Sequence, residues 1–223
     1  MANINNSLGS FSGRIGDMVF CSGSKSRSPY VRSVSSKTKK PSPEQQATRL
    51  KFKMTSNVLT PFRSLIERCW KKKDGRKTAY EQAFGHVVSS GFQAGYPEIK
   101  LNFSQVRLSA GRLQSAATFV YERTGSKLEF LWTNHANDRL PVTTNSNYDE
   151  VIVALYSEEL GLAAVYRDGV RRAHEFTSIE MDDAFSKGKL HAWLIFLSED
   201  GKEASMSLYL GDGMNKNNLS SNS

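Results

Sequence analysis

Residues 118–211 contain seven short apolar runs: TFVYE (118–122), KLEFLW (127–132), VIVALY (151–156), LAAVY (162–166), HEFTSI (174–179), LHAWLIFL (190–197) and ASMSLYL (204–210). Turn residues separate the runs, among them Thr124-Gly125-Ser126, Asp168-Gly169 and Asp200-Gly201. Short β-rich runs at this spacing are typical of an antiparallel β-sandwich of the immunoglobulin or fibronectin-III kind. Such a scaffold supports many functions, so it does not by itself assign one.

The beginning of the chain predicts a β-hairpin. Segments 11–21 and 28–34 form its arms, and the basic, glycine-containing segment 23–27 forms its loop. Alternation along the first arm places Ile15 and Val19 on one side and Met18 and Phe20 on the other. A two-stranded hairpin alone is marginally stable in water, so it must pack on the helices behind it, on the sandwich or on a neighbouring molecule.

Helices are expected between the hairpin and the sandwich. The segment Ser42–Gln45 is a helix start, with serine at the N-cap, proline at the first helical position and glutamine where a capping box needs it. The pair Thr60-Pro61 either kinks this helix or caps a second one. Thr78 opens a further helix that ends near Gly91. Alternating apolar residues between 99 and 108 predict one or two strands leading into the sandwich.

These patterns define an α+β chain. A flexible lead occupies residues 1–10, a basic hairpin-plus-helices module residues 11–97, the β-sandwich domain residues 98–211 and a disordered, Asn/Ser-rich tail residues 212–223. Trp132 and Trp193 are the expected core anchors of the sandwich. The polar segment 135–148 is its longest loop and the place where a sandwich usually builds binding contacts, although a solvated connection is the simpler interpretation.

Charge is distributed unevenly along the chain, whose net charge is +8. Residues 1–100 hold eighteen Lys/Arg and six Asp/Glu, whereas residues 101–223 hold twelve and sixteen. A basic half next to a mildly acidic half indicates either a polyanion partner or attraction between copies of the chain.

The sequence carries few signals for cellular location or for a role of its cysteines. No run approaches the ~18 apolar residues of a membrane helix, so we expect no membrane span. The first residues lack the basic and apolar regions of a secretory signal, which favours a cytoplasmic protein or export by a signal-independent route. Cys21 and Cys69 lie in different predicted elements and are expected to be small, partly buried residues rather than a disulfide or a zinc site.

The sequence predicts no catalytic residue, no metal site and no cofactor. The four histidines, His86, His135, His174 and His191, show no metal-ligand spacing. No serine lies in a Gly-x-Ser-x-Gly motif. The glycines near the N-terminus neither follow a strand nor open a helix, so a dinucleotide or phosphate loop is not expected.

Basic residues gather in the predicted hairpin and linker with a tyrosine among them. Basic residues with interleaved aromatics are typical of a surface that follows a phosphate backbone, so nucleic acid is an alternative partner through residues 14–77. The simpler interpretation is that the charge solvates this part of the chain. The residues expected to contact a partner or polyanion are Arg14, Lys25, Arg27, Tyr30, Arg32, Lys37, Lys39 and Lys40.

Ordered motifs at both ends resemble a known family. They are Leu8–Gly16, Tyr30-Val31-Arg32, then Pro41, Gln45, Arg49 and Phe52, and near the end Phe196–Lys202 and Ser207–Gly211. This set is similar to the signature of a bacterial domain-of-unknown-function family over residues 8–211. The resemblance implies the two-part architecture and, because the family has no established activity, no catalytic residue.

We therefore expect a non-catalytic interaction or structural-assembly protein, in which the basic N-terminal module attaches to a protein partner or to another copy and the sandwich is the scaffold. A sequence-independent polyanion-binding protein is the first alternative. A carbohydrate- or surface-binding module is the second.

Overall fold

The chain folds into two compact units, residues 1–42 and 43–223, of the expected α+β class. The computed structural model describes residues 2–3, 12–22, 28–34, 40–71, 75, 77–116, 118–134, 147–182, 185 and 189–211. Among these residues no helix is long and apolar enough to cross a membrane.

The first unit is a small antiparallel sheet. It contains β1 (Ala2–Asn3), β2 (Gly13–Ile15), β3 (Met18–Cys21) and β4 (Tyr30–Ser33), in the order β1-β4-β3-β2. The hairpin of β3 and β4 is confirmed, while its loop 23–27 lies outside the described residues.

The expected first arm of the hairpin is itself a tight hairpin. It turns back at Gly16-Asp17, where the positive φ of Gly16 (57°) suits glycine, so that Ile15 pairs with Met18. Directly paired residues share a face of the sheet. The expected placement of Ile15 and Met18 on opposite sides is therefore wrong, because a two-residue turn reverses the chain within what the sequence presents as one alternating run.

The second unit begins with helices α1 (Pro43–Leu59), α2 (Arg63–Cys69) and α3 (Ala79–Ser90). A 3-10 turn, η1 (Thr60–Phe62), joins α1 to α2, so Pro61 separates two helices rather than kinking one. At the start of α3, the Glu81 N–H donates to Thr78 Oγ1 (3.1 Å) and the Thr78 N–H donates to Glu81 Oε2 (2.8 Å). This reciprocal capping box explains why α3 begins where Thr78 predicts.

A short hairpin and a single 3-10 turn connect the helices to the sandwich. The hairpin consists of β5 (Phe92–Gln93) and β6 (Lys100–Leu101), and the turn is η2 (Phe103–Gln105). The strands expected between residues 99 and 108 are thus reduced to β6. Val106 and Leu108 are nevertheless buried, so the apolar pattern there reflects burial in the core and not a strand.

Two antiparallel sheets form the sandwich, as the seven apolar runs predict. One has the order β10-β9-β12-β13 and the other the order β11-β8-β7. The strands are β7 (Phe119–Thr124), β8 (Lys127–Trp132), β9 (Glu150–Ser157), β10 (Leu162–Tyr166), β11 (Phe176–Glu180), β12 (Leu190–Leu197) and β13 (Leu208–Gly211). A 3-10 turn, η3 (Arg172–His174), precedes β11, so His174, the first residue of the fifth apolar run, lies in this turn and not in a strand.

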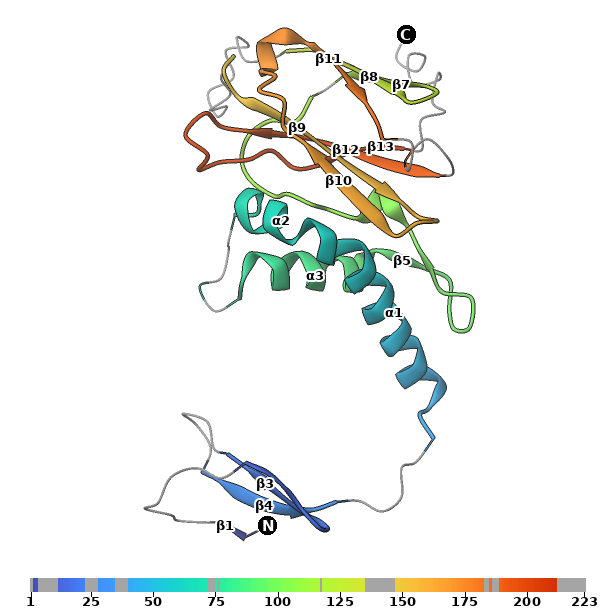
Figure 1. The fold of residues 1–223 in the computed structure, drawn as a ribbon, viewed down its shortest axis with the longest axis vertical. Coiled ribbons are helices and arrows are strands. Elements are labelled where there is room, and N and C mark those ends of the chain that lie inside the picture. Colours follow the sequence, from blue (N-terminus) through green and yellow to red (C-terminus); the bar gives the residue numbers. More distant parts are fainter. Residues whose placement is uncertain are drawn as a thin grey trace. The chain divides into compact units, whose positions relative to one another are not determined.

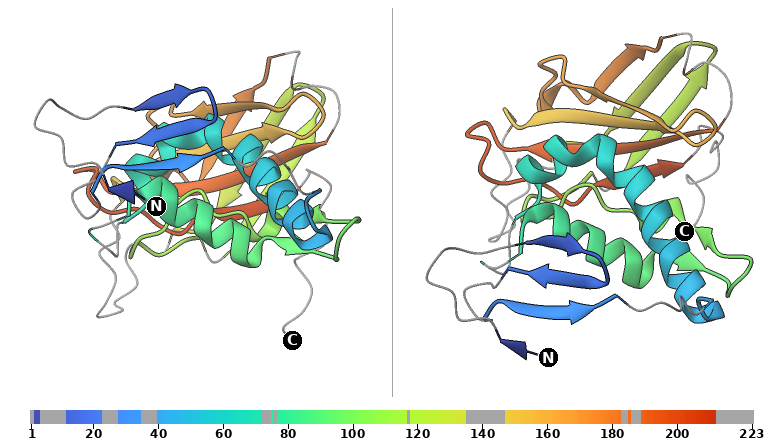
Figure 2. Two further views of the ribbon diagram at one scale, coloured as in Figure 1. Left: turned by 90° about the horizontal axis from the view of Figure 1, so that it is seen from below. Right: turned by 60° about the horizontal axis from the view of Figure 1, so that its bottom comes forward.

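The second unit has three layers, because the helices cover one face of the sheet that contains β9 and β12 (Figure 1 and Figure 2). Trp193 and Ile195 of β12 pack into the helix-side core, whereas Leu194 and Phe196 pack into the core between the two sheets. Trp132 lies in the second core, so both tryptophans are buried as expected. The helices therefore share a core with the sandwich, and the structure divides the chain between residues 42 and 43 rather than between 97 and 98.

A buried ion pair joins the ends of the sandwich strands. Arg172 Nε donates to Asp149 Oδ2 (3.0 Å), and both side chains are 1% exposed. The same guanidinium donates to the Gln114 carbonyl (2.9 Å) and lies 3.8 Å from the ring centroid of Phe196. Burial lowers the pKa of Arg172, and the Asp149 carboxylate opposes that change. The pair satisfies charges that the core could not otherwise hold.

We expect Arg172→Ala to lower the free energy of unfolding by about 3–5 kcal/mol, because it leaves the Asp149 charge buried without its partner. Arg167→Ala is the matched control. It breaks a partly exposed pair with Glu150 (2.7 Å) and should cost about 1 kcal/mol or less. Urea unfolding followed by circular dichroism measures both, and equal losses would contradict a structural role for the buried pair.

Candidate functional site

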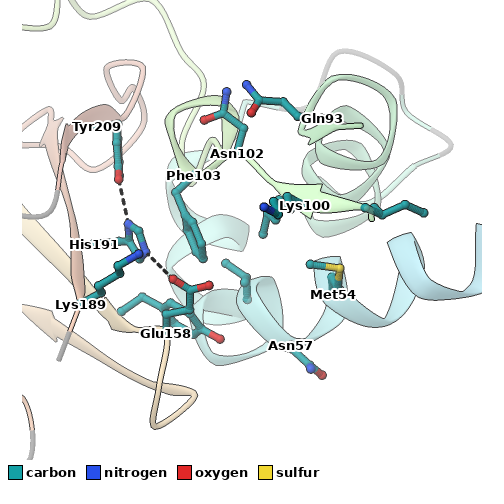
Figure 3. A pocket seen from close by; sticks show the side chains of 14 residues that line it. Met54, Asn57, Gln93, Lys100, Asn102, Phe103, Glu158, Lys189, His191 and Tyr209 are labelled. Atoms are coloured by element: carbon teal, nitrogen blue, oxygen red, sulfur yellow. Dashed lines mark hydrogen bonds and ion pairs between the residues drawn. The ribbon is translucent and has the colours of Figure 1, made fainter. Parts of the chain in front are cut away.

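A pocket of about 670 Å3 lies between the helical layer and the sheet of β9, β12 and β13 (Figure 3). Its apolar side is formed by Met54 and Val58 of α1 together with Ile99, Leu101 and Phe103. A cavity of this size with apolar walls and a few convergent polar groups is the usual form of a small-molecule site.

His191 of β12 is an enclosed polar side chain of the pocket, with 8% of its side chain exposed. Its ring stacks on Phe103 with a centroid separation of 3.6 Å. Nδ1 lies 2.8 Å from the Tyr209 hydroxyl and Nε2 lies 3.5 Å from Glu158 Oε2 (Figure 3). The separation of His191 Nδ1 and the Tyr209 hydroxyl oxygen is that of a hydrogen bond, in which the imidazole tautomer decides which of the two atoms donates.

Strand register places His191 and Tyr209 on the helix side of the sheet. His191 pairs directly with Tyr156 of β9, and Trp193 pairs with Tyr209 of β13. Residues i and i+2 of a strand share a face, so His191 and Trp193 point toward the helices together. Burial, and then the charge of Glu158, raises the pKa of Tyr156, so this phenol stays neutral well above neutral pH.

Exposed or half-buried polar residues complete the lining. They include Lys100 of β6, Lys189 just before β12, and the amides of Asn57, Gln93 and Asn102. Asn102 Oδ1 accepts hydrogen bonds from the Ser104 N–H (3.1 Å) and hydroxyl (2.7 Å), which caps η2 and fixes the turn that carries Phe103. The pocket thus has an apolar side, an enclosed histidine and more lysines than carboxylates.

Three of the residues expected to contact a partner come together on the N-terminal sheet. Arg14 pairs with Val19, and Val19 pairs with Arg32, so the two arginines share one face. Tyr30 lies two residues before Arg32 and therefore on the same face. Arg14 Nε donates to the Gly16 carbonyl (2.8 Å).

The structure does not test most of the other partner-contact predictions. Lys40 is described but lies beyond β4, while Lys25, Arg27, Lys37 and Lys39 lie outside the described residues. Most of the predicted binding loop 135–148 also lies outside them.

The opposite face of the N-terminal sheet is apolar. The register places Ile15, Met18, Phe20 and Val31 on it. Ile15 is 70% exposed and Met18 is 53% exposed. No described residue of the first unit is buried, so this sheet has no core of its own within the part of the chain that the structure describes.

The cysteines and the possible metal ligands show whether the described residues include a reactive thiol or a metal site. Cys69 is a buried free thiol, and burial raises its pKa to about 11, so almost none of it is thiolate at neutral pH. Cys21 is also a free thiol. No group of three or more His, Cys, Asp or Glu in the described ranges could hold a metal ion.

A family model described as a family of unknown function, DUF6266, matches residues 10–211. The chain belongs to this family. The expected resemblance to a family of unknown function is thereby confirmed. No curated protein and no solved structure matches the chain, so the immunoglobulin or fibronectin-III likeness of the DUF6266 sandwich stays a prediction.

The sequence did not single out the pocket. Its polar side chains come from separate segments of the DUF6266 chain, and His191 stands within the apolar run 190–197. A histidine inside an otherwise apolar strand is a usable signal, because a buried imidazole needs partners.

We expect Tyr209→Phe to lower the free energy of unfolding by about 1 kcal/mol, because His191 Nδ1 loses its partner. His191→Ala also removes the stack on Phe103 and should cost about 2–3 kcal/mol. Because the two side chains contact each other, the double variant should cost less than the sum of the single variants. Tyr148→Phe, at a side chain that is 64% exposed, is the control and should stay within about 0.5 kcal/mol of the parent. Additive losses in thermal and urea unfolding would refute the coupling.

Proposed function

We propose that this DUF6266 protein is a non-catalytic assembly protein, in which the N-terminal sheet of one copy docks on the sandwich of a second copy. The observation that carries the proposal is the exposed pair Ile15 and Met18 on a sheet without buried residues in its described part. A sheet this small needs its apolar face covered to be stable. Burying each of these side chains would contribute about 1.5–3 kcal/mol.

The outer face of the β11-β8-β7 sheet offers a matching surface. Val120, Leu131 and Phe176 pair in register across its three strands, and Leu131 and Phe176 are 44% and 45% exposed. Sheet-on-sheet packing between two such apolar faces is a common way to build a core.

Charge favours a second copy as the partner. Next to the apolar row, Glu122 and Glu129 pair directly on the same strands. On this face the strands carry Glu122, Glu129 and Glu180 against Lys127, which pairs with Glu129 (2.6 Å). Residues 1–42, in contrast, hold seven Lys/Arg and one acidic residue, Asp17. Opposite charge on the two partners speeds their encounter and disfavours pairing of like surfaces.

We expect Ile15→Lys/Met18→Lys to weaken self-association at least tenfold, because two apolar anchors are replaced by charges. Leu131→Lys/Phe176→Lys, on the receiving face, should do the same. The matched control, Leu160→Lys/Leu162→Lys, replaces two residues that are 50% and 47% exposed and should leave association unchanged. Size-exclusion chromatography with light scattering over a concentration series measures the mass. A parent chain that stays monomeric throughout would refute the proposal.

We also propose polyanion binding as a second candidate, favoured by the shared face of Arg14, Tyr30 and Arg32. Two arginines beside an aromatic ring can contact phosphates while a base stacks on the ring. This face is opposite the apolar one, so both activities could operate on one sheet.

We expect the parent chain to bind oligothymidylate at low salt and to lose affinity steeply as salt is added. Arg14→Ser/Arg32→Ser should lower the slope of log affinity against log salt by roughly 1.4, about 0.7 for each lost phosphate contact. Arg112→Ser/Lys202→Ser, at two exposed positions of the second unit outside residues 14–77, is the control. Fluorescence anisotropy measures binding, and no binding by the parent chain at low salt would remove this candidate.

A further inference from the structure

We infer that the pocket between the helices and the β9-β12-β13 sheet binds a small hydroxylated organic anion, namely a sugar acid or a sugar phosphate. This function is separate from assembly, because the pocket lies on the helix side of the sandwich and uses no residue of the proposed interface.

The charge of the lining favours an anion. Lys100 and Lys189 contribute two ammonium groups, and Glu158 is the single carboxylate among the lining residues. Its Oε2 lies 3.5 Å from His191 Nε2, and the two lysines outnumber this one carboxylate. A carboxylate or phosphate on the ligand would form charge-assisted hydrogen bonds with the lysines.

The polar groups favour hydroxyls on the rest of the ligand. Asn57, Gln93 and Asn102 approach the pocket from α1, β5 and the segment after β6. An amide side chain carries both donors and an acceptor, which is the pairing that a hydroxyl group needs. The Tyr209 hydroxyl, which is hydrogen-bonded to His191 Nδ1 (2.8 Å), adds a further polar group to the lining.

The apolar side fits the carbon face of such a ligand. Met54, Val58 and Ile99 contribute apolar surface to the lining. A sugar ring has hydroxyls at its edge and C–H groups on its faces, so it can contact both sides at once. A fully apolar ligand would leave the lysines and amides desolvated without partners, which costs free energy.

The histidine makes the site rigid before a ligand arrives. His191 is held by the ring of Phe103 and by the Tyr209 hydroxyl, and β9 and β12 are buried along their lengths. A preformed site loses little conformational entropy on binding.

Isothermal titration calorimetry of the full chain with glucuronate, glucose 6-phosphate and glucose tests the inference. We expect at least one of the two anions to bind and neutral glucose to bind at least tenfold more weakly. Lys100→Gln/Lys189→Gln should weaken anion binding at least tenfold while the thermal unfolding temperature stays unchanged. Lys53→Gln/Lys127→Gln, at two other exposed lysines of the second unit, is the matched control and should bind like the parent.

Each result of the titrations has its own interpretation. Binding of glucuronate alone identifies a sugar acid, and binding of glucose 6-phosphate alone identifies a sugar phosphate. No binding of either anion, equal binding of glucose, or equal loss in the control variant overturns the inference. None of these results depends on self-association, which light scattering measures independently on the same samples.

Discussion

The pairing of β9 with β12 is the constraint on which the second unit depends. Eight residue pairs join the two strands, and both strands are buried almost throughout. A strand buried on both faces must alternate between two cores, and here it faces the helices on one side and the second sheet on the other. The helices, the second sheet and the wall of the pocket are all positioned by this pair.

The two units differ in how many side chains they bury. The second unit buries two apolar clusters and an ion pair, whereas the described residues of the first bury nothing. Conformational entropy opposes the ordering of every residue. The small sheet would therefore be stabilised by packing its apolar face on another apolar surface. The family match spans both units, from residue 10 to 211, and includes β2, β3 and β4 of the small sheet. This combination favours attachment as the role of the sheet.

Local patterns predicted the elements, and tertiary packing decided the rest. The strand runs, the helix start at Pro43 and the opening of α3 follow from turn and capping chemistry. Apart from His191 the run 190–197 is apolar, as in a strand buried on both faces, but nothing in the run identifies the helices as the cover of one face. The turn at Gly16-Asp17 was hidden inside an alternating run. The pairing of Arg172 with Asp149 has no sequence signal, because it depends on where distant strand ends meet.

The pocket and the proposed docking face lie on opposite sides of the sandwich. The pocket is on the helix side of the β10-β9-β12-β13 sheet, and the apolar row that includes Leu131 is on the outer side of the β11-β8-β7 sheet. A ligand in the pocket would therefore not compete with a docked copy for the same residues. Any coupling between them would have to pass through the β9–β12 pair, whose close packing on both faces resists small displacements. The two proposed activities, self-association and anion binding, therefore do not exclude each other.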